Sequence, residues 1–191
     1  MKEEFYIRSE RTGHTDNKWK VLAWNLVYQY LFRTSPKFLR WWRIYLLRLF
    51  GAKIGKMCFV APTAFITRPW EFEMGYFSGI DDNCYIIPPV KIGDRVAIAN
   101  NCHLIAGGHN IWTRGFEQEF KTIEVGNCAF LCCGVYVSMG CKIGEASVVA
   151  SHLNVLKNIP ENTVVSQLPN GKIIYVPRIP EEEYHNYRYK H

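Results

Sequence analysis

Residues 125–155 read VGNCAFLCCGVYVSMGCKIGEASVVASHLNV, and an aliphatic residue returns at every sixth position of this stretch. The series consists of Val125, Leu131, Val137, Ile143, Val149 and Val155. A helix repeats every ~3.6 residues and one face of a strand every ~2, so neither element explains the spacing. A six-residue period indicates a parallel β-helix, in which each hexad forms one side of a coil.

The same period runs through two earlier stretches, and two extra residues separate them. The aliphatic positions there are Ile54, Val60 and Ile66, then Met74, Ile80, Ile86, Ile92, Ile98 and Leu104. We therefore predict an all-β solenoid, a left-handed parallel β-helix of hexapeptide repeats with its aliphatic side chains inward. The residue after the aliphatic one is often Gly, as at Gly75, and we expect it to adopt unusual backbone angles near the corners.

The cysteines fit this repeat. Four of the seven occupy the fifth position of a hexad, where small residues predominate; they are Cys58, Cys84, Cys102 and Cys141. We interpret them as small buried apolar residues. No CxxC pair suggests a metal or redox site.

Composition limits the remaining classes. The chain has 191 residues, of which 48% are apolar and 21% charged, and this predicts one substantial core. A net charge of +6 suits phosphate-bearing ligands or an anionic membrane surface. We find no recognition-helix signature or base-stacking motif and predict no nucleic-acid partner. The charged start lacks an apolar signal region, so we expect a cytoplasmic protein with reduced thiols.

The flanks of the repeat differ from it. Residues 1–52 are interpreted as a tail and a helical cap with two helices, the second beginning after the N-cap Ser35 at Pro36. The basic and aromatic segment 37–50 predicts at most weak contact with a membrane surface, beside its role as a cap. We place the β-helix at 53–160 and a closing segment with a solvated tail at 161–191.

One interruption breaks the period between Leu104 and Val125. We interpret most of residues 108–122 as a loop projecting from the solenoid, because long loops in compact repeats are usually functional or disordered. The loop opens on Gly107, Gly108 and His109.

These features together resemble the hexapeptide-repeat O-acetyltransferases, and most closely the branch that serves colanic acid and other surface polysaccharides. The resemblance rests on LLRLFGAKIG (46–55), VKIGDRVAIANNCHL (90–104), GGHN (107–110) and residues 123–165. It implies transfer of an acyl group, most simply acetyl, from acyl-CoA to a sugar hydroxyl on a nucleotide- or lipid-linked saccharide. It also implies that His109 is the general base.

The chemistry of that reaction justifies a histidine independently. A sugar hydroxyl is a poor nucleophile, and a neutral imidazole can take its proton at neutral pH as it attacks the thioester. Transfer is then direct, without an acyl-enzyme. We expect Glu117 to orient the imidazole, with Glu119 as the second candidate. The alternative is that His109 merely sits in a glycine-rich turn.

The resemblance also assigns binding residues. The substrate-binding Asn of the family falls at Asp81, beside Asn83, and this departure puts the acceptor contacts in question. Lys172 lies in SQLPNGK, which replaces the usual ending of the family. The expected coenzyme-binding residues are Phe130, Cys133, Ser151, Leu156, Lys157 and Lys172.

Assembly and alternatives complete the sequence-based expectations. We predict a homotrimer with the site between subunits, because the projecting loop needs a partner face. A metalloenzyme like the γ-class carbonic anhydrases is one alternative, using His103, His109 and His152, although no ligand pattern supports zinc and we expect no metal requirement. A non-catalytic β-helical scaffold is the other alternative.

Overall fold

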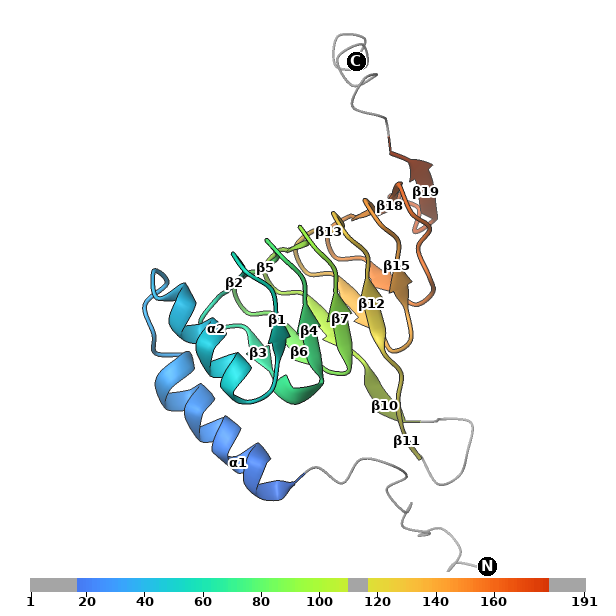
Figure 1. Ribbon diagram of the computed structural model, residues 1–191. Coiled ribbons are helices and arrows are strands. Elements are labelled where there is room, and N and C mark those ends of the chain that lie inside the picture. The colour runs from blue at the N-terminus through green and yellow to red at the C-terminus, as the bar shows by residue number, and fades with distance from the viewer. Residues whose placement is uncertain (1–16, 110–116, 179–191) are drawn as a thin grey trace, which may run out of the picture.

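The structure, a computed structural model, describes residues 17–109 and 117–178, and they wind into a left-handed solenoid of short parallel strands (Figure 1). Three sheets form its sides. Sheet A contains β1 (Lys53–Ile54), β4 (Phe72–Met74), β7 (Val90–Ile92), β12 (Ile123–Val125) and β15 (Lys142–Ile143). Sheet B contains β2 (Phe59–Val60), β5 (Gly79–Ile80), β8 (Ala97–Ile98), β13 (Phe130–Leu131), β16 (Val148–Val149), β18 (Thr163–Gln167) and the antiparallel β19 (Ile173–Pro177). Sheet C contains β3 (Phe65–Ile66), β6 (Tyr85–Ile87), β9 (His103–Ile105), β14 (Tyr136–Ser138) and β17 (Asn154–Val155).

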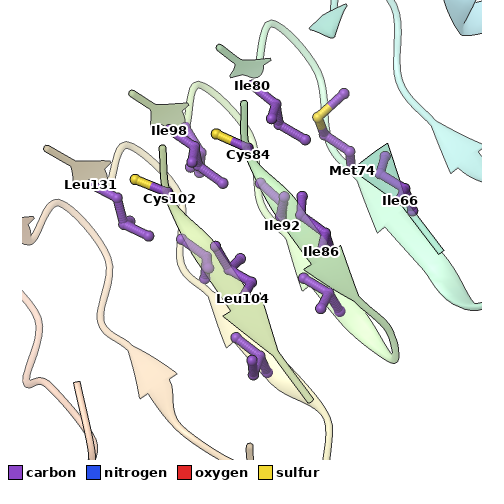
Figure 2. Close-up of a cluster of buried hydrophobic side chains, with 14 of the residues drawn as sticks. Ile66, Met74, Ile80, Cys84, Ile86, Ile92, Ile98, Cys102, Leu104 and Leu131 are labelled. Carbon is purple, nitrogen blue, oxygen red and sulfur yellow. The ribbon is translucent and has the colours of Figure 1, made fainter. Parts of the chain in front are cut away.

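The aliphatic residues of the repeat stack in register inside the solenoid. In sheet B, for example, Ile80 pairs with Ile98 and Ile98 with Leu131, and all three are almost fully buried. Figure 2 shows these side chains pointing into one continuous core beside Ile86, Ile92 and Leu104. Each coil buries its inner face against its neighbours, so the predicted solenoid is confirmed.

Where the fifth position of a hexad is Cys or Ser, its side chain is a hydrogen-bond donor as well as small. The thiol of Cys84 donates to the carbonyl of Ala99 at 3.1 Å, and that of Cys102 to the carbonyl of Cys132 at 3.1 Å. The hydroxyl of Ser78 donates to the carbonyl of Gly93 at 2.8 Å. From the sequence, these residues were expected only to be small and buried. The structure adds that the Cys and Ser side chains link one coil to the next by hydrogen bonds.

We expected the glycines that follow the aliphatic residues to adopt unusual backbone angles, and this expectation was wrong. Left-handed backbone falls at the fourth position of the hexads, at residues such as Asn83 (φ 58°) and His152 (φ 59°). At the second position the coils approach closely, and a Cβ on Gly75 would lie 2.6 Å from the carbonyl carbon of Gly93. Glycine is needed there because neighbouring backbones leave no room for a side chain.

Two helices cover the end of the solenoid formed by its first coil, opposite the β18–β19 hairpin (Figure 1). They are α1 (Lys18–Val27), continued by a π-helical turn η1 (Tyr28–Phe32), and α2 (Arg40–Leu49). The inner side of the cap is anchored by Trp24, whose indole donates to the carbonyl of Ile66 at 2.8 Å.

The predicted start of the second helix at Pro36, capped by Ser35, was wrong, because α2 begins at Arg40. The guanidinium of buried Arg43 explains the delay. It donates to the carbonyls of Pro36 and Lys37 at 2.7 and 2.8 Å and to the Ser35 hydroxyl at 3.0 Å. These bonds hold the segment before α2 in a non-helical path.

A short 3-10 helix, η2 (Pro69–Glu71), takes up the two extra residues between the first and second coils. Residues 1–16, 110–116 and 179–191, which include most of the predicted terminal tails and the tip of the projecting loop, lie outside the described residues. None of the described helices is both long and apolar enough to cross a bilayer.

Candidate active site

The projecting loop begins and ends as an antiparallel hairpin that leaves the solenoid between sheets C and A (Figure 1). Its strands are β10 (Gly107–His109) and β11 (Gln118–Phe120). His109 is exposed at the outer end of β10 and pairs in register with Gln118. The imidazole is therefore carried away from the solenoid body, where a second molecule can reach it.

The two carboxylates considered as its orienting group lie on the other strand. Glu117 is exposed directly before β11, next to the residue that faces His109. Glu119 pairs in register with Gly108, and its carboxylate lies 3.1 Å from the Lys121 ammonium. Glu117 and Glu119 both flank Gln118, the residue in register with His109, so both remain candidates for the orienting group.

The base of the hairpin is held by an aromatic ring and a buried cation. The ring of Phe120 covers Gly107, where an added Cβ would lie 2.4 Å from the ring. The Arg68 guanidinium lies 4.3 Å from the centroid of the same ring and 3.2 Å from the Glu71 carboxylate. Arg68 also donates to the carbonyl of Pro88. The sequence did not indicate a role for Arg68. Nothing in the spacing of the first coil predicts that its extra residues lie next to a hairpin about 50 residues later in the chain.

The main chain completes this attachment. The Lys121 amide donates to the carbonyl of Ala106 at 2.9 Å, and the Ala106 amide donates to the carbonyl of Ile87 at 2.9 Å. The Gly140 amide donates to the carbonyl of Lys121 at 3.0 Å. Both ends of the excursion are thus tied into the coils above and below it.

Corner B–C, the set of turns that lead from sheet B to sheet C, carries both residues predicted to bind the acceptor. The Asp81 carboxylate accepts from the Asp82 amide at 2.8 Å, and the Asn83 amide donates to the Thr63 hydroxyl at 2.9 Å. Asp82, which the sequence did not single out, pairs with the Lys37 ammonium and accepts from Thr63 at 2.8 Å. The hydrogen bond from Lys37, followed by that from Thr63, holds the Asp82 pKa below its ordinary value.

Two of the predicted coenzyme residues, Cys133 and Ser151, lie on this same corner in later coils. Cys133 directly follows Cys132, whose pKa is raised chiefly by burial. A thiol with a raised pKa is a poor nucleophile at neutral pH. This argues against Cys132 as the site of an acyl-cysteine.

The other predicted coenzyme residues are spread more widely. Phe130 is exposed on the outer face of sheet B. Leu156 and Lys157 lie on corner C–A, the edge from which the hairpin projects, and the Lys157 ammonium lies 5.3 Å from the centroid of the Tyr175 ring. Lys172 is exposed in the turn between β18 and β19.

Within one chain, sheet C separates the predicted base from the predicted acceptor residues. In the third coil, the corner residue Asn101 and the hairpin residue Gly107 lie at opposite ends of β9. At about 3.3 Å per extended residue, the six-residue step spans roughly 20 Å. His109 and Asp81 therefore lie on different edges of the same subunit.

A shallow hollow of about 710 Å³ lies over sheet A and the turns beside it. Its lining includes Arg48, Lys53, Glu73 and Lys91, but none of the predicted site residues. Lys53 and Glu73 pair there at 2.9 Å in a row of alternating charges along the sheet. We assign this hollow no part in the proposed reaction, because none of the predicted catalytic or binding residues lines it.

The histidines of the metalloenzyme alternative occupy separate surroundings. His103 lies on the outer face of sheet C, with its ring 6.2 Å from that of Tyr85, whereas His152 packs over Gly134 at corner B–C. Within residues 17–109 and 117–178, no group of three or more His, Cys, Asp or Glu side chains could hold a metal ion.

A coil of hexads with a single histidine-bearing hairpin defines a hexapeptide-repeat acyltransferase. A protein of Escherichia coli K12 named colanic acid biosynthesis acetyltransferase WcaF is 35% identical over 150 residues, covering 78% of this chain and 82% of its own length. The chain therefore belongs to the family of the colanic acid biosynthesis acetyltransferases. The galactoside O-acetyltransferase of Escherichia coli K12 is 28% identical over 129 residues, or 65% of this chain and 64% of the relative. No protein-family model matches the chain.

Solved structures show the same fold. A maltose O-acetyltransferase from Clostridium difficile 630 has a TM-score of 0.74 at 21% identity and covers 86% of this chain and 88% of its own. A galactoside acetyltransferase in complex with coenzyme A has a TM-score of 0.70 at 22% identity, covering 87% and 84%.

Proposed function

We propose that this chain transfers an acetyl group from acetyl-CoA to a sugar hydroxyl of an activated saccharide in surface-polysaccharide synthesis. The observation that carries the proposal is the 35% identity to a colanic acid biosynthesis acetyltransferase, in a chain whose projecting hairpin carries His109. Relatives solved with coenzyme A or acetyl-CoA support the choice of donor.

His109 acts as the general base. Its imidazole takes the proton of the acceptor hydroxyl while the oxygen attacks the thioester carbonyl. The tetrahedral intermediate then expels the thiolate of CoA, which receives the proton from the imidazolium, and the products are the sugar ester and free CoA. Backbone amides stabilise the oxyanion, and Glu117 orients the imidazole.

The working form is a homotrimer with each site between two subunits. The separation of His109 and Asp81 on different edges of sheet C supports this arrangement, because one subunit alone cannot bring them together. A neighbour related by rotation brings its corner B–C against the hairpin of the first subunit. Asp81 and Asn83 then bind the acceptor, while Cys133, Ser151, Leu156, Lys157 and Lys172 line the coenzyme groove with Phe130.

The decisive experiment measures free thiol release from acetyl-CoA and longer acyl-CoAs against a panel of nucleotide- and lipid-linked sugars. We expect acetyl-CoA and one class of activated sugar to give turnover that His109→Ala abolishes. Gln118→Ala is the matched control, because it alters the hairpin residue opposite His109 and leaves the imidazole in place. Equal loss in both variants, or turnover without any sugar acceptor, would reject the proposal.

A further inference from the structure

The first helical segment of the cap is apolar on two opposite sides. Trp24, Tyr28 and Phe32 face the solenoid: Trp24 and Phe32 are buried, and the Tyr28 ring lies 4.4 Å from that of Phe65. A second series, shifted by two residues, is exposed and consists of Trp19, Leu22, Leu26 and Tyr30. Two residues turn a helix by about 200°, so this second series points away from the solenoid.

Helix α2 repeats this arrangement. Arg43, Ile44, Leu46 and Leu47 are its buried side. Trp41, Tyr45 and Leu49 recur at four-residue steps on the opposite side and are 65%, 54% and 64% exposed. Phe38, just before the helix, is 79% exposed. The indole of Trp42 donates to the carbonyl of Leu31 at 3.2 Å and joins the two helical segments into one surface.

The charges of the cap have one sign only. Residues 17–50 contain seven Lys and Arg residues and no Asp or Glu. The whole chain has a net charge of +6, so all residues outside 17–50 together carry −1. Among the cap cations, Arg33 and Arg40 are exposed beside the outer aromatic side chains.

We propose that the outer face of residues 17–50 docks on an anionic lipid bilayer. We define this docking face by its exposed side chains, which are Trp19, Leu22, Leu26, Tyr30, Phe38, Trp41, Tyr45, Leu49, Arg33 and Arg40. Exposed aromatic and aliphatic side chains bordered by Lys and Arg are the composition of helices that lie in the membrane interface. Basic residues near an anionic surface strengthen such binding.

Charge disfavours the simplest alternative occupant, a second copy of this chain. Two copies seated face to face would bring Arg33 and Arg40 of each together, and residues 17–50 contain no Asp or Glu to pair with them. The cap lies at the opposite end of the solenoid from the β18–β19 hairpin (Figure 1), so docking through it uses the end of the molecule rather than its sides. This inference extends the weak contact expected of 37–50 to α1 and is independent of the reaction at His109.

The test is flotation of the full chain with phosphatidylcholine vesicles, with and without phosphatidylglycerol. We expect binding to the anionic vesicles, little binding to the neutral ones, and release as salt shortens the Debye length. Arg40→Glu should weaken binding roughly tenfold, since it replaces one attraction to the surface by a repulsion. Arg95→Glu, the same change on an exposed solenoid corner, should have little effect.

The apolar part is tested by Trp41→Ser with Tyr45→Ser. This pair should reduce vesicle binding at least tenfold, whereas Ile173→Ser with Val176→Ser, at the other end of the solenoid, should not. Sedimentation of all variants runs in parallel. The proposal is overturned if folded wild-type chain does not float with anionic vesicles, or if the Trp41 and Tyr45 substitutions change the oligomeric state, which would show that another copy covers the face.

Discussion

The guanidinium of Arg68 lies 4.3 Å from the centroid of the Phe120 ring, although the two residues belong to coils separated by the whole second coil. The ring thus contacts both a buried cation and the backbone of Gly107, two residues before the proposed base, and we call these two contacts the clamp. We expect this clamp to fix the direction in which the hairpin leaves the solenoid.

Phe120→Leu should lower kcat about tenfold, because a small displacement of a catalytic group is costly even when binding is intact. The free energy of unfolding should fall by only about 1 kcal/mol, the scale of an aromatic contact with a cation. Steady-state kinetics and thermal melts measure the two effects. A normal kcat in a folded Phe120→Leu enzyme would show that the clamp does not position His109.

His109→Ala should lower kcat by about two to four orders of magnitude, the usual contribution of a positioned general base. The affinity for acetyl-CoA, measured by calorimetry, should barely change. Glu117→Ala should give a smaller loss, because it affects the orientation of the imidazole. In the wild-type enzyme kcat should fall on the acid side, since a protonated imidazole cannot accept a proton; a flat acid limb would argue against the mechanism.

The proposed site between subunits predicts complementation between two inactive variants. His109→Ala damages the hairpin side of a site, and Ser151→Trp blocks the corner side. Trimers reassembled from an equal mixture should recover about a quarter of wild-type activity, because one interface in four then has two intact halves. Sedimentation must show mixed trimers; such trimers without activity, or a fully active monomer, would contradict the arrangement.

The ion pair between Lys37 and Asp82 joins the cap to the second coil and predicts a pH-dependent stability. Since the folded pKa of Asp82 lies below its ordinary value, the pair stabilises the fold above that ordinary value. The contribution is lost as the pH falls through the folded pKa. Lys37→Met should lower Tm by roughly 1–2 °C at neutral pH, the scale of an exposed ion pair, and by nothing in strong acid.

A matching test of this pair uses a double-mutant cycle. In an Asp82→Asn background, Lys37→Met should leave Tm unchanged at every pH, because its partner charge is absent. If Lys37→Met still lowers Tm in strong acid, or in the chain that already carries Asp82→Asn, then Lys37 acts through packing alone.

Metal independence remains a prediction. Treatment with a chelator should leave kcat unchanged, because the proposed steps use an imidazole and backbone amides rather than a Lewis acid. Loss of activity that zinc restores would favour the metalloenzyme alternative with His103, His109 and His152.

The sequence by itself determined the solenoid and its core. A residue such as Ile98 must lie in register with Ile80 and Leu131, because a coil can bury its aliphatic side chains only against the same positions of its neighbours. The interruption of that period located the hairpin, and the residue type His109 indicated its chemistry. These features follow from local spacing and from the chemistry of one side chain.

Only the tertiary structure decided the contacts made where the period fails. Arg68 reaches Phe120 because two extra residues form η2 beneath the hairpin, and Arg43 delays α2 by binding the carbonyls before it. The structure likewise separated His109 from Asp81 by the width of sheet C. Long side chains such as arginine bind across gaps that no repeat specifies, so their partners depend on how distant segments pack and cannot be read from spacing.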